Sequence, residues 1–172
     1  MRQYRYLRPA MFVMTLTVLE MQRIGADSIK GVDLFFKQKA RQDKKEIGAL
    51  ETAQQQISLL ALMDEGWQSK EILESIEELE NIEAFYEEML DSWRRGDIDK
   101  LAHRYLARLQ SFPRLYQALL VDRNINWLES IEKFLQEEKN TMVIVGAAHL
   151  AGSDGLINLL RKRGYKIFRL KE

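Results

Sequence analysis

One histidine follows an apolar run at a point where a side chain could take part in chemistry. Residues 141–145 are apolar or β-branched without alternation, and Gly146-Ala147-Ala148-His149 comes next. The run predicts a buried strand, and the small residues after it predict a tight turn. Ligands bind beyond the carboxyl ends of strands in open α/β sheets, so His149 is a candidate catalytic or ligand-binding residue. A structural hydrogen-bonding role is the alternative.

Glu51 occupies the same kind of position in the first half of the chain. Residues 46–50 predict a short strand, and Thr52 with Gln55 forms the sequence pattern of a capping box that starts a helix over 53–63. A catalytic zinc site uses three protein ligands, and here only His149 and Glu51 are plausible neighbours. The other histidine, His103, lies in a charged helical segment and is expected at the surface.

Arg123 and Asn124 are further candidates at the beginning of a predicted helix. An arginine there could bind a carboxylate or phosphate with two hydrogen bonds, and an ion pair with one of the many glutamates is the alternative. The sequence has no Gly-x-Ser-x-Gly nucleophile motif, no glycine-rich phosphate loop and no cysteine. It therefore lacks the signatures of serine hydrolases, nucleotide binding, cysteine nucleophiles and thiolate zinc sites.

The predicted fold class is α/β and helix-rich, with a small, mostly parallel sheet and a helical insertion. Strands are expected over 46–50, 141–145 and 166–170, the last two joined by a helix that Ser153 caps. One long amphipathic helix is expected over 69–93, and further helices cover 9–24, 31–41, 53–63, 97–109 and 121–138. Residues 1–172 are predicted to form a single domain in which 64–118 are the helical insertion.

Charge and hydropathy indicate which kinds of partner the chain is expected to bind. Of 172 residues, 26 are Lys or Arg and 26 are Asp or Glu, so the net charge gives no reason to expect binding to nucleic acid. The apolar run over 10–19 is too short to span a bilayer and has no signal-peptide cleavage pattern after it. An exposed sheet edge is expected to pair with another chain, which predicts a homodimer.

Several motifs together resemble the TraB/PrgY/GumN family, which includes the Tiki-like membrane proteases. Each motif is short, but their order covers nearly the whole chain. They are Gly31-Val32-Asp33 with Phe36, Leu50-Glu51-Thr52 with Gln56, Trp93 with Gly96-Asp97, Phe112-Pro113-Arg114-Leu115-Tyr116, Arg123-Asn124 with Trp127, Val145-Gly146-Ala147-Ala148-His149-Leu150 with Gly152, Gly155-Leu156 with Leu159-Leu160, and Gly164-Tyr165.

The resemblance implies a metal-dependent hydrolase that uses Mn²⁺, Co²⁺ or Zn²⁺, with a peptide as the expected substrate. It implies that His149 is a metal ligand or general base, that Glu51 is a ligand or proton shuttle, and that Gly146 belongs to the binding motif. Arg123 and Asn124 would hold the substrate or the developing oxyanion. Only the second of the family's two Gly-x-x-His motifs has a counterpart, so the chain is expected to match the carboxy-terminal portion and to be inactive in isolation.

Two further expectations accompany the resemblance. The family suggests the cell envelope or an extracytoplasmic location, which no residue of this chain specifies. The alternative to hydrolysis is a non-enzymatic domain that binds a peptide or partner, for example through the acidic helix over 69–93.

Overall fold

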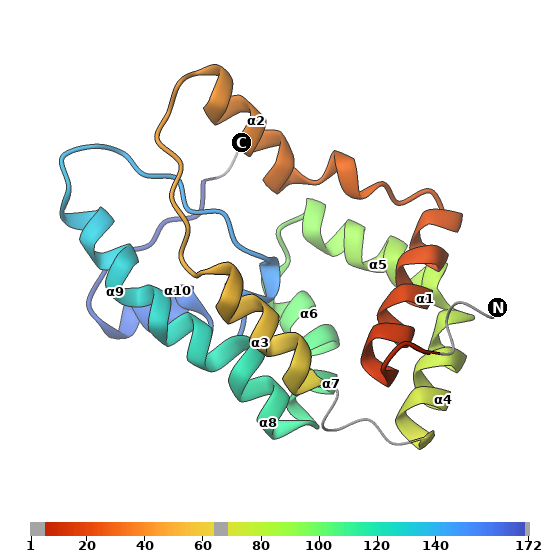
Figure 1. Ribbon diagram of the computed structural model, residues 1–172. Helices are drawn as coiled ribbons and strands as arrows, with labels where there is room; N and C mark the ends of the chain where they lie inside the picture. The colour runs from red at the N-terminus through yellow and green to blue at the C-terminus, as the bar shows by residue number, and fades with distance from the viewer. Residues whose placement is uncertain (1–5, 64–68, 171–172) are drawn as a thin grey trace. The chain divides into compact units, whose positions relative to one another are not determined.

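All regular secondary structure in the part of the chain that the structure describes is helical. The computed structural model covers residues 6–63 and 69–170, and it divides into two compact units, Met1–Leu90 and Asp91–Glu172. Every regular element in those residues is a helix (Figure 1). None of these helices is both long enough and apolar enough to cross a membrane.

The first unit is built from helices. Ala10 and Val13 of α1 are buried, and α1 packs against α4 (Figure 1). Ile82, at the beginning of α5, is also buried. In order, the elements are α1 (Pro9–Arg23), the 3₁₀ helix η2 (Ser28–Lys30), α2 (Val32–Gln42), α3 (Ala53–Met63), α4 (Ser69–Leu79) and α5 (Ile82–Arg94), which continues into the second unit.

Local capping signals place several helix ends where the sequence predicts them. Pro9 occupies the first turn of α1, and Gly25, with a φ of 89°, follows its end. At α3, the Thr52 amide donates to Gln55 Oε1 at 2.7 Å and the Gln55 amide donates to Thr52 Oγ1 at 3.2 Å. This reciprocal pair confirms the capping box and the bounds of the helix over 53–63.

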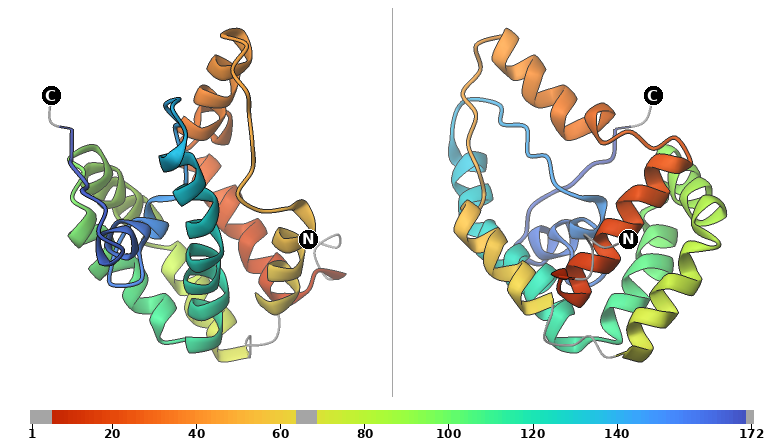
Figure 2. Two further views of the ribbon diagram at one scale, coloured as in Figure 1. Left: turned by 90° about the vertical axis from the view of Figure 1, so that its left-hand side faces the viewer. Right: turned by 45° about the vertical axis from the view of Figure 1, so that its right-hand side comes forward.

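The second unit contains two helical rods and a turn that carries His149. Leu106, Leu120 and Ala151 form its buried apolar cluster, and α10 packs against α9 (Figure 2). The first rod is α6 (Ile98–Leu101), the π-helical η4 (Ala102–Leu106) and α7 (Ala107–Gln110); the second is α8 (Pro113–Tyr116), the π-helical η5 (Gln117–Val121) and α9 (Asp122–Gln136). The 3₁₀ helix η6 (Ala147–His149) and α10 (Leu156–Lys162) follow.

The predicted α/β class, with a small and mostly parallel sheet, is wrong. Residues 46–50, 141–145 and 166–170 have no regular secondary structure and form no ladder with any other segment of residues 6–63 and 69–170. Met142 is 64% exposed and Ile144 is 40% exposed, so the run before His149 is not a strand covered on both faces. An apolar β-branched run becomes a strand only where neighbouring strands satisfy its amides and carbonyls.

Two helix predictions also need correction. The helix expected over 69–93 is two helices, because turn residues Glu80 and Asn81 separate α4 from α5. The cap of α10 is Gly155 and not Ser153, whose hydroxyl donates instead to Asp154 Oδ2 at 3.2 Å. By contrast, the helix expected over 97–109 begins where the sequence predicts: Asp97 caps α6, since its Oδ1 accepts from the Lys100 amide at 3.0 Å.

The expected homodimer loses its structural premise, since the described residues contain no sheet edge. The dimer itself stays a prediction that light scattering at high protein concentration can test. The assignment of residues 1–172 to a single domain, with 64–118 as an insertion, likewise stays a prediction.

Candidate functional site

The imidazole of His149 lies against a buried asparagine of α9. His149 ends η6, and its amide donates to Gly146 O at 2.9 Å, which folds the chain tightly after residues 141–145. The side chain is 8% exposed, and its Nδ1 lies 2.7 Å from Oδ1 of Asn124, which is 1% exposed. Two residues that the sequence singled out separately are therefore in direct contact.

The other hydrogen bonds of Asn124 determine which ring nitrogen of His149 carries the hydrogen. Asn124 Nδ2 donates to the backbone carbonyl of Asp154 at 2.8 Å and to that of His149 at 3.4 Å. Carbonyls only accept, so the amide nitrogen must face them and the amide oxygen must face the imidazole. An amide oxygen also only accepts, so Nδ1 of His149 carries the hydrogen. In the neutral ring the lone pair is then at Nε2.

Trp127, one turn after Asn124, packs against the same imidazole. The rings of Trp127 and His149 have centroids 4.5 Å apart at an interplanar angle of 46°. The guanidinium carbon of Arg123 lies 4.9 Å from the centroid of the Trp127 ring, and Arg123 Nη1 donates to Leu119 O at 3.0 Å. Arg123 is therefore close to the candidate site but already bonded to the backbone of η5 and stacked on the indole.

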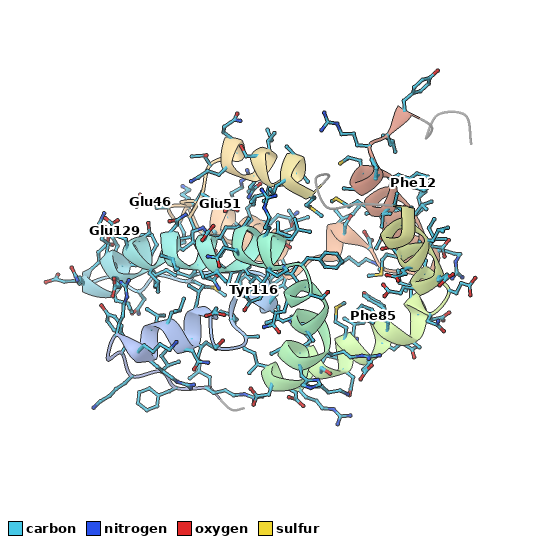
Figure 3. The ribbon with its side chains drawn as sticks, turned by 90° about the horizontal axis from the view of Figure 1, so that it is seen from below. Phe12, Glu46, Glu51, Phe85, Tyr116 and Glu129 are labelled. Atoms are coloured by element: carbon cyan, nitrogen blue, oxygen red, sulfur yellow. The ribbon has the colours of Figure 1, made fainter. Side chains whose placement is uncertain are left out.

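The turn after His149 is held by a second side chain from the α8–α9 rod. The Tyr116 hydroxyl donates to Asp154 Oδ2 at 2.9 Å, which links residues 38 positions apart. Figure 3 labels Tyr116 toward one end of this rod and Glu129 toward the other. Tyr116 also packs against the cluster of Leu106, Leu120 and Ala151. The position of its hydroxyl is thus set by the core of the unit.

The environment of Tyr116 changes its acidity. Partial burial raises the pKa of the Tyr116 phenol above its ordinary value of 10.0, and the bond to Asp154 raises it further, while the side chain of Gln110 opposes the rise. A raised pKa means that the folded state holds this proton more tightly than the unfolded chain. The resulting stability is fully present below the unfolded value and is lost as the pH rises through the folded value.

We therefore expect the wild-type protein to lose stability above about pH 10 more steeply than a Tyr116→Phe variant. The variant is the less stable of the two at neutral pH, and the difference should shrink as the phenol ionises. Thermal unfolding midpoints measured at a series of pH values between neutrality and the alkaline range would show this convergence. Tyr165→Phe, in the segment after α10, is the control, and two parallel pH profiles for Tyr116→Phe and wild type would contradict the expectation.

The remaining candidates lie in different surroundings. Glu51 belongs to the first unit and lies just before α3 (Figure 3). Its Oε1 accepts from Nε2 of Gln56, in the first turns of α3, at 3.0 Å. A methyl group added at Gly146 would lie 3.8 Å from His149 Cδ2, so the space beside the imidazole accommodates a small group. Among residues 6–63 and 69–170, no three His, Cys, Asp or Glu side chains are grouped closely enough to hold a metal ion.

Residues 1–169 match the sequence model of the TraB/PrgY/gumN family. The chain belongs to this family. The match includes Glu51, Arg123-Asn124 and the Gly146–His149 motif, and it confirms the resemblance inferred from the motifs.

One relative of this TraB/PrgY/gumN protein is "Metalloprotease TIKI1" from Danio rerio. The two are 22% identical over 186 residues, an alignment that includes 93% of this chain. The chain spans 38% of the length of that relative. No solved structure matches the chain significantly.

Sequence reasoning missed three residues around His149 in this family member. Trp127 and Tyr116 were part of the family motifs but had no assigned role, and Asp154 was not singled out. Trp127 follows Asn124 by three positions, so helical periodicity alone places both on one face of α9. Nothing in the local sequence indicates that Asp154 accepts two hydrogen bonds from different turns of the rod, one at its carboxylate from Tyr116 and one at its backbone carbonyl from Asn124.

Proposed function

We propose that this chain supplies part of the active site of a metal-dependent, peptidase-like hydrolase of the TraB/PrgY/gumN family. The observation that carries the proposal is the contact between His149 Nδ1 and Asn124 Oδ1 at 2.7 Å. Histidines that bind metals usually donate the hydrogen of their other ring nitrogen to an oxygen acceptor, which fixes the ring and the tautomer. His149 has this arrangement, and a relative is named a metalloprotease.

His149 and its neighbours can supply one ligand of a metal site, but they do not supply the complete set of ligands. The Nε2 lone pair can bind Mn²⁺, Co²⁺ or Zn²⁺. If His149 is instead a general base, the same lone pair accepts a proton. A divalent ion bound there would activate a water molecule and polarise the carbonyl of a peptide substrate. Since no three-residue cluster is present among the described residues, further ligands are required from other parts of the protein.

The remaining site residues have distinct parts in the proposal. Glu51 is the second proposed ligand or proton shuttle, in a different unit from His149. Arg123 would face the substrate or the oxyanion, and Gly146 would leave room for the substrate beside the ring. Asn124 acts through His149, because its Oδ1 and Nδ2 are both engaged and its side chain is buried.

A manganese titration followed by NMR tests the first step of this proposal. Paramagnetic Mn²⁺ broadens nearby signals even when binding is weak, so it can detect an incomplete site. The ring signals of His149 should broaden at lower Mn²⁺ concentration than those of His103, the exposed second histidine. His149→Ala should remove the site, whereas His103→Ala should leave it unchanged. Equal broadening of the two histidines would refute the proposed ligand.

The contribution of Glu51 and the reaction itself need separate measurements. Glu51→Gln should weaken Mn²⁺ binding, and Glu46→Gln, five residues earlier and exposed, is its matched control. Peptide cleavage with and without added Mn²⁺, Co²⁺ or Zn²⁺ should depend on His149 wherever activity is found. Activity that persists in His149→Ala would exclude the hydrolase mechanism. Absence of any stoichiometric metal site would favour the non-enzymatic alternative, a peptide- or partner-binding domain.

A further inference from the structure

A single residue of the turn after His149 receives hydrogen bonds from two points of the α8–α9 rod. Asp154 accepts at Oδ2 from the Tyr116 hydroxyl at 2.9 Å, and it accepts at its backbone oxygen from Asn124 Nδ2 at 2.8 Å. Ser153 Oγ donates to the same carboxylate oxygen at 3.2 Å. Asp154 therefore connects the beginning of the rod to the asparagine that holds the imidazole.

The turn reaches this position because two glycines let its backbone fold closely. Gly152 has a φ of 76°, a backbone conformation that residues with a Cβ rarely adopt. At Gly155 an added Cβ would lie 2.3 Å from Ala151 O, so only glycine allows the backbone to approach itself there. Ala151, immediately before Gly152, is buried in the core cluster that Tyr116 also contacts. The turn is thus fixed both by packing and by its bonds to the rod.

We propose that Tyr116 and Asp154 are positioning residues for His149. Tyr116 fixes the Asp154 side chain, and the carbonyl of Asp154 accepts from the Asn124 amide. That bond keeps Asn124 Oδ1 toward the ring and therefore keeps the hydrogen on Nδ1 of His149. The importance of Nε2 as a ligand rests on the proposed function, whereas the control of the tautomer does not.

The tautomer of His149 can be measured without any metal. Long-range ¹H–¹⁵N correlation spectra of the full chain distinguish a hydrogen on Nδ1 from one on Nε2. The spectra are recorded at an alkaline pH at which a further increase no longer changes the signals of either ring. Wild-type His149 should then show the Nδ1–H form, and the exposed His103 serves as an internal reference. In Tyr116→Phe we expect His149 to become a mixture of the two forms, with His103 unchanged.

Matched variants separate positioning from a general effect on folding. Asp154→Asn keeps an acceptor oxygen for Tyr116 and the same backbone carbonyl, so it should preserve the Nδ1–H form. Asp154→Ala should behave as Tyr116→Phe does, and both should raise hydrogen exchange of the amides in residues 149–155 by roughly tenfold. Tyr165→Phe should change neither signal. A folded Tyr116→Phe protein with an unaltered His149 tautomer would overturn the inference.

The manganese titration distinguishes this inference from the proposed function. If the tautomer shifts in Tyr116→Phe but wild-type His149 does not bind Mn²⁺, the positioning role stands and the hydrolase proposal fails. If wild-type His149 binds Mn²⁺ and Tyr116→Phe changes neither the tautomer nor the affinity, the positioning role fails and the hydrolase proposal stands. When both are correct, Tyr116→Phe should weaken Mn²⁺ binding roughly tenfold, as substitutions behind metal ligands commonly do.

Discussion

Gly155→Ala is expected to destabilise the protein by about 3 kcal/mol, because the added methyl group would overlap backbone atoms that have no room to move. Its Cβ would lie 2.3 Å from Ala151 O and 2.6 Å from Leu150 O. Leu150 and Ala151 directly follow η6, and Ala151 is 4% exposed in the core cluster. The overlap therefore cannot be relieved by rotating a side chain, and the turn that holds Asp154 must shift.

Urea unfolding of Gly155→Ala and two control variants would isolate this effect. Gly48→Ala has no atom within 4 Å of the new Cβ and no positive φ, so its stability should be close to wild type. Gly164→Ala also has open space but a φ of 89°, and it should lose about 1 kcal/mol from backbone strain alone. The expectation for Gly155 is wrong if its variant loses no more than Gly164→Ala does.

The helix ends that the sequence predicted correctly are those that depend on neighbouring residues only. Pro9, the pair of Thr52 and Gln55, and Asp97 each act within one helical turn, so their partners are visible in the sequence itself. Gly164, with a φ of 89°, likewise follows the end of α10, a position at which glycine commonly ends a helix. Such signals require no knowledge of tertiary structure.

The strand predictions failed because strand formation depends on partners distant in sequence. The composition of residues 141–145 favours a strand, yet these residues have no regular secondary structure before η6. A sheet additionally needs another segment in register with it, which no property of the run itself specifies. Met142, Val143 and Ile144 of this run remain exposed in the described structure, with Met142 at 64%.

The candidate site was predictable as a set of residues but not as an arrangement. His149 and Asn124 were selected for separate reasons, and their contact across 25 positions follows only from the packing of η6 on α9. Helical spacing puts Ile125 on the same face of α9 as Leu128, yet Ile125 is 50% exposed and Leu128 is 2% exposed. An apolar pattern counts Ile125 as buried and Asn124 as exposed, whereas three hydrogen bonds make the asparagine the buried residue.

The buried amide of Asn124 leads to a second large expected effect. Asn124→Leu should lower the free energy of unfolding by about 3 kcal/mol, although leucine is similar in size. The substitution removes the acceptor of His149 Nδ1–H and the donor to the carbonyls of His149 and Asp154. Burying polar groups without these bonds is unfavourable, because water satisfies them in the unfolded chain. Asn126→Leu, at an exposed position of the same helix, should change stability by less than about 0.5 kcal/mol.

Asn124→Asp tests whether the donor, and not only the shape, is required. Aspartate keeps an oxygen toward His149 but places a second oxygen where Nδ2 faces two carbonyl oxygens. Electrostatic repulsion between these acceptors should make this variant at least as unstable as Asn124→Leu at neutral pH, despite its nearly identical shape. Urea unfolding measures the stability, and the NMR tautomer signature shows whether His149 keeps its Nδ1 hydrogen. If Asn124→Asp retained wild-type stability, the amide would not hold the turn, and the assignment of the hydrogen to Nδ1 would lose its support.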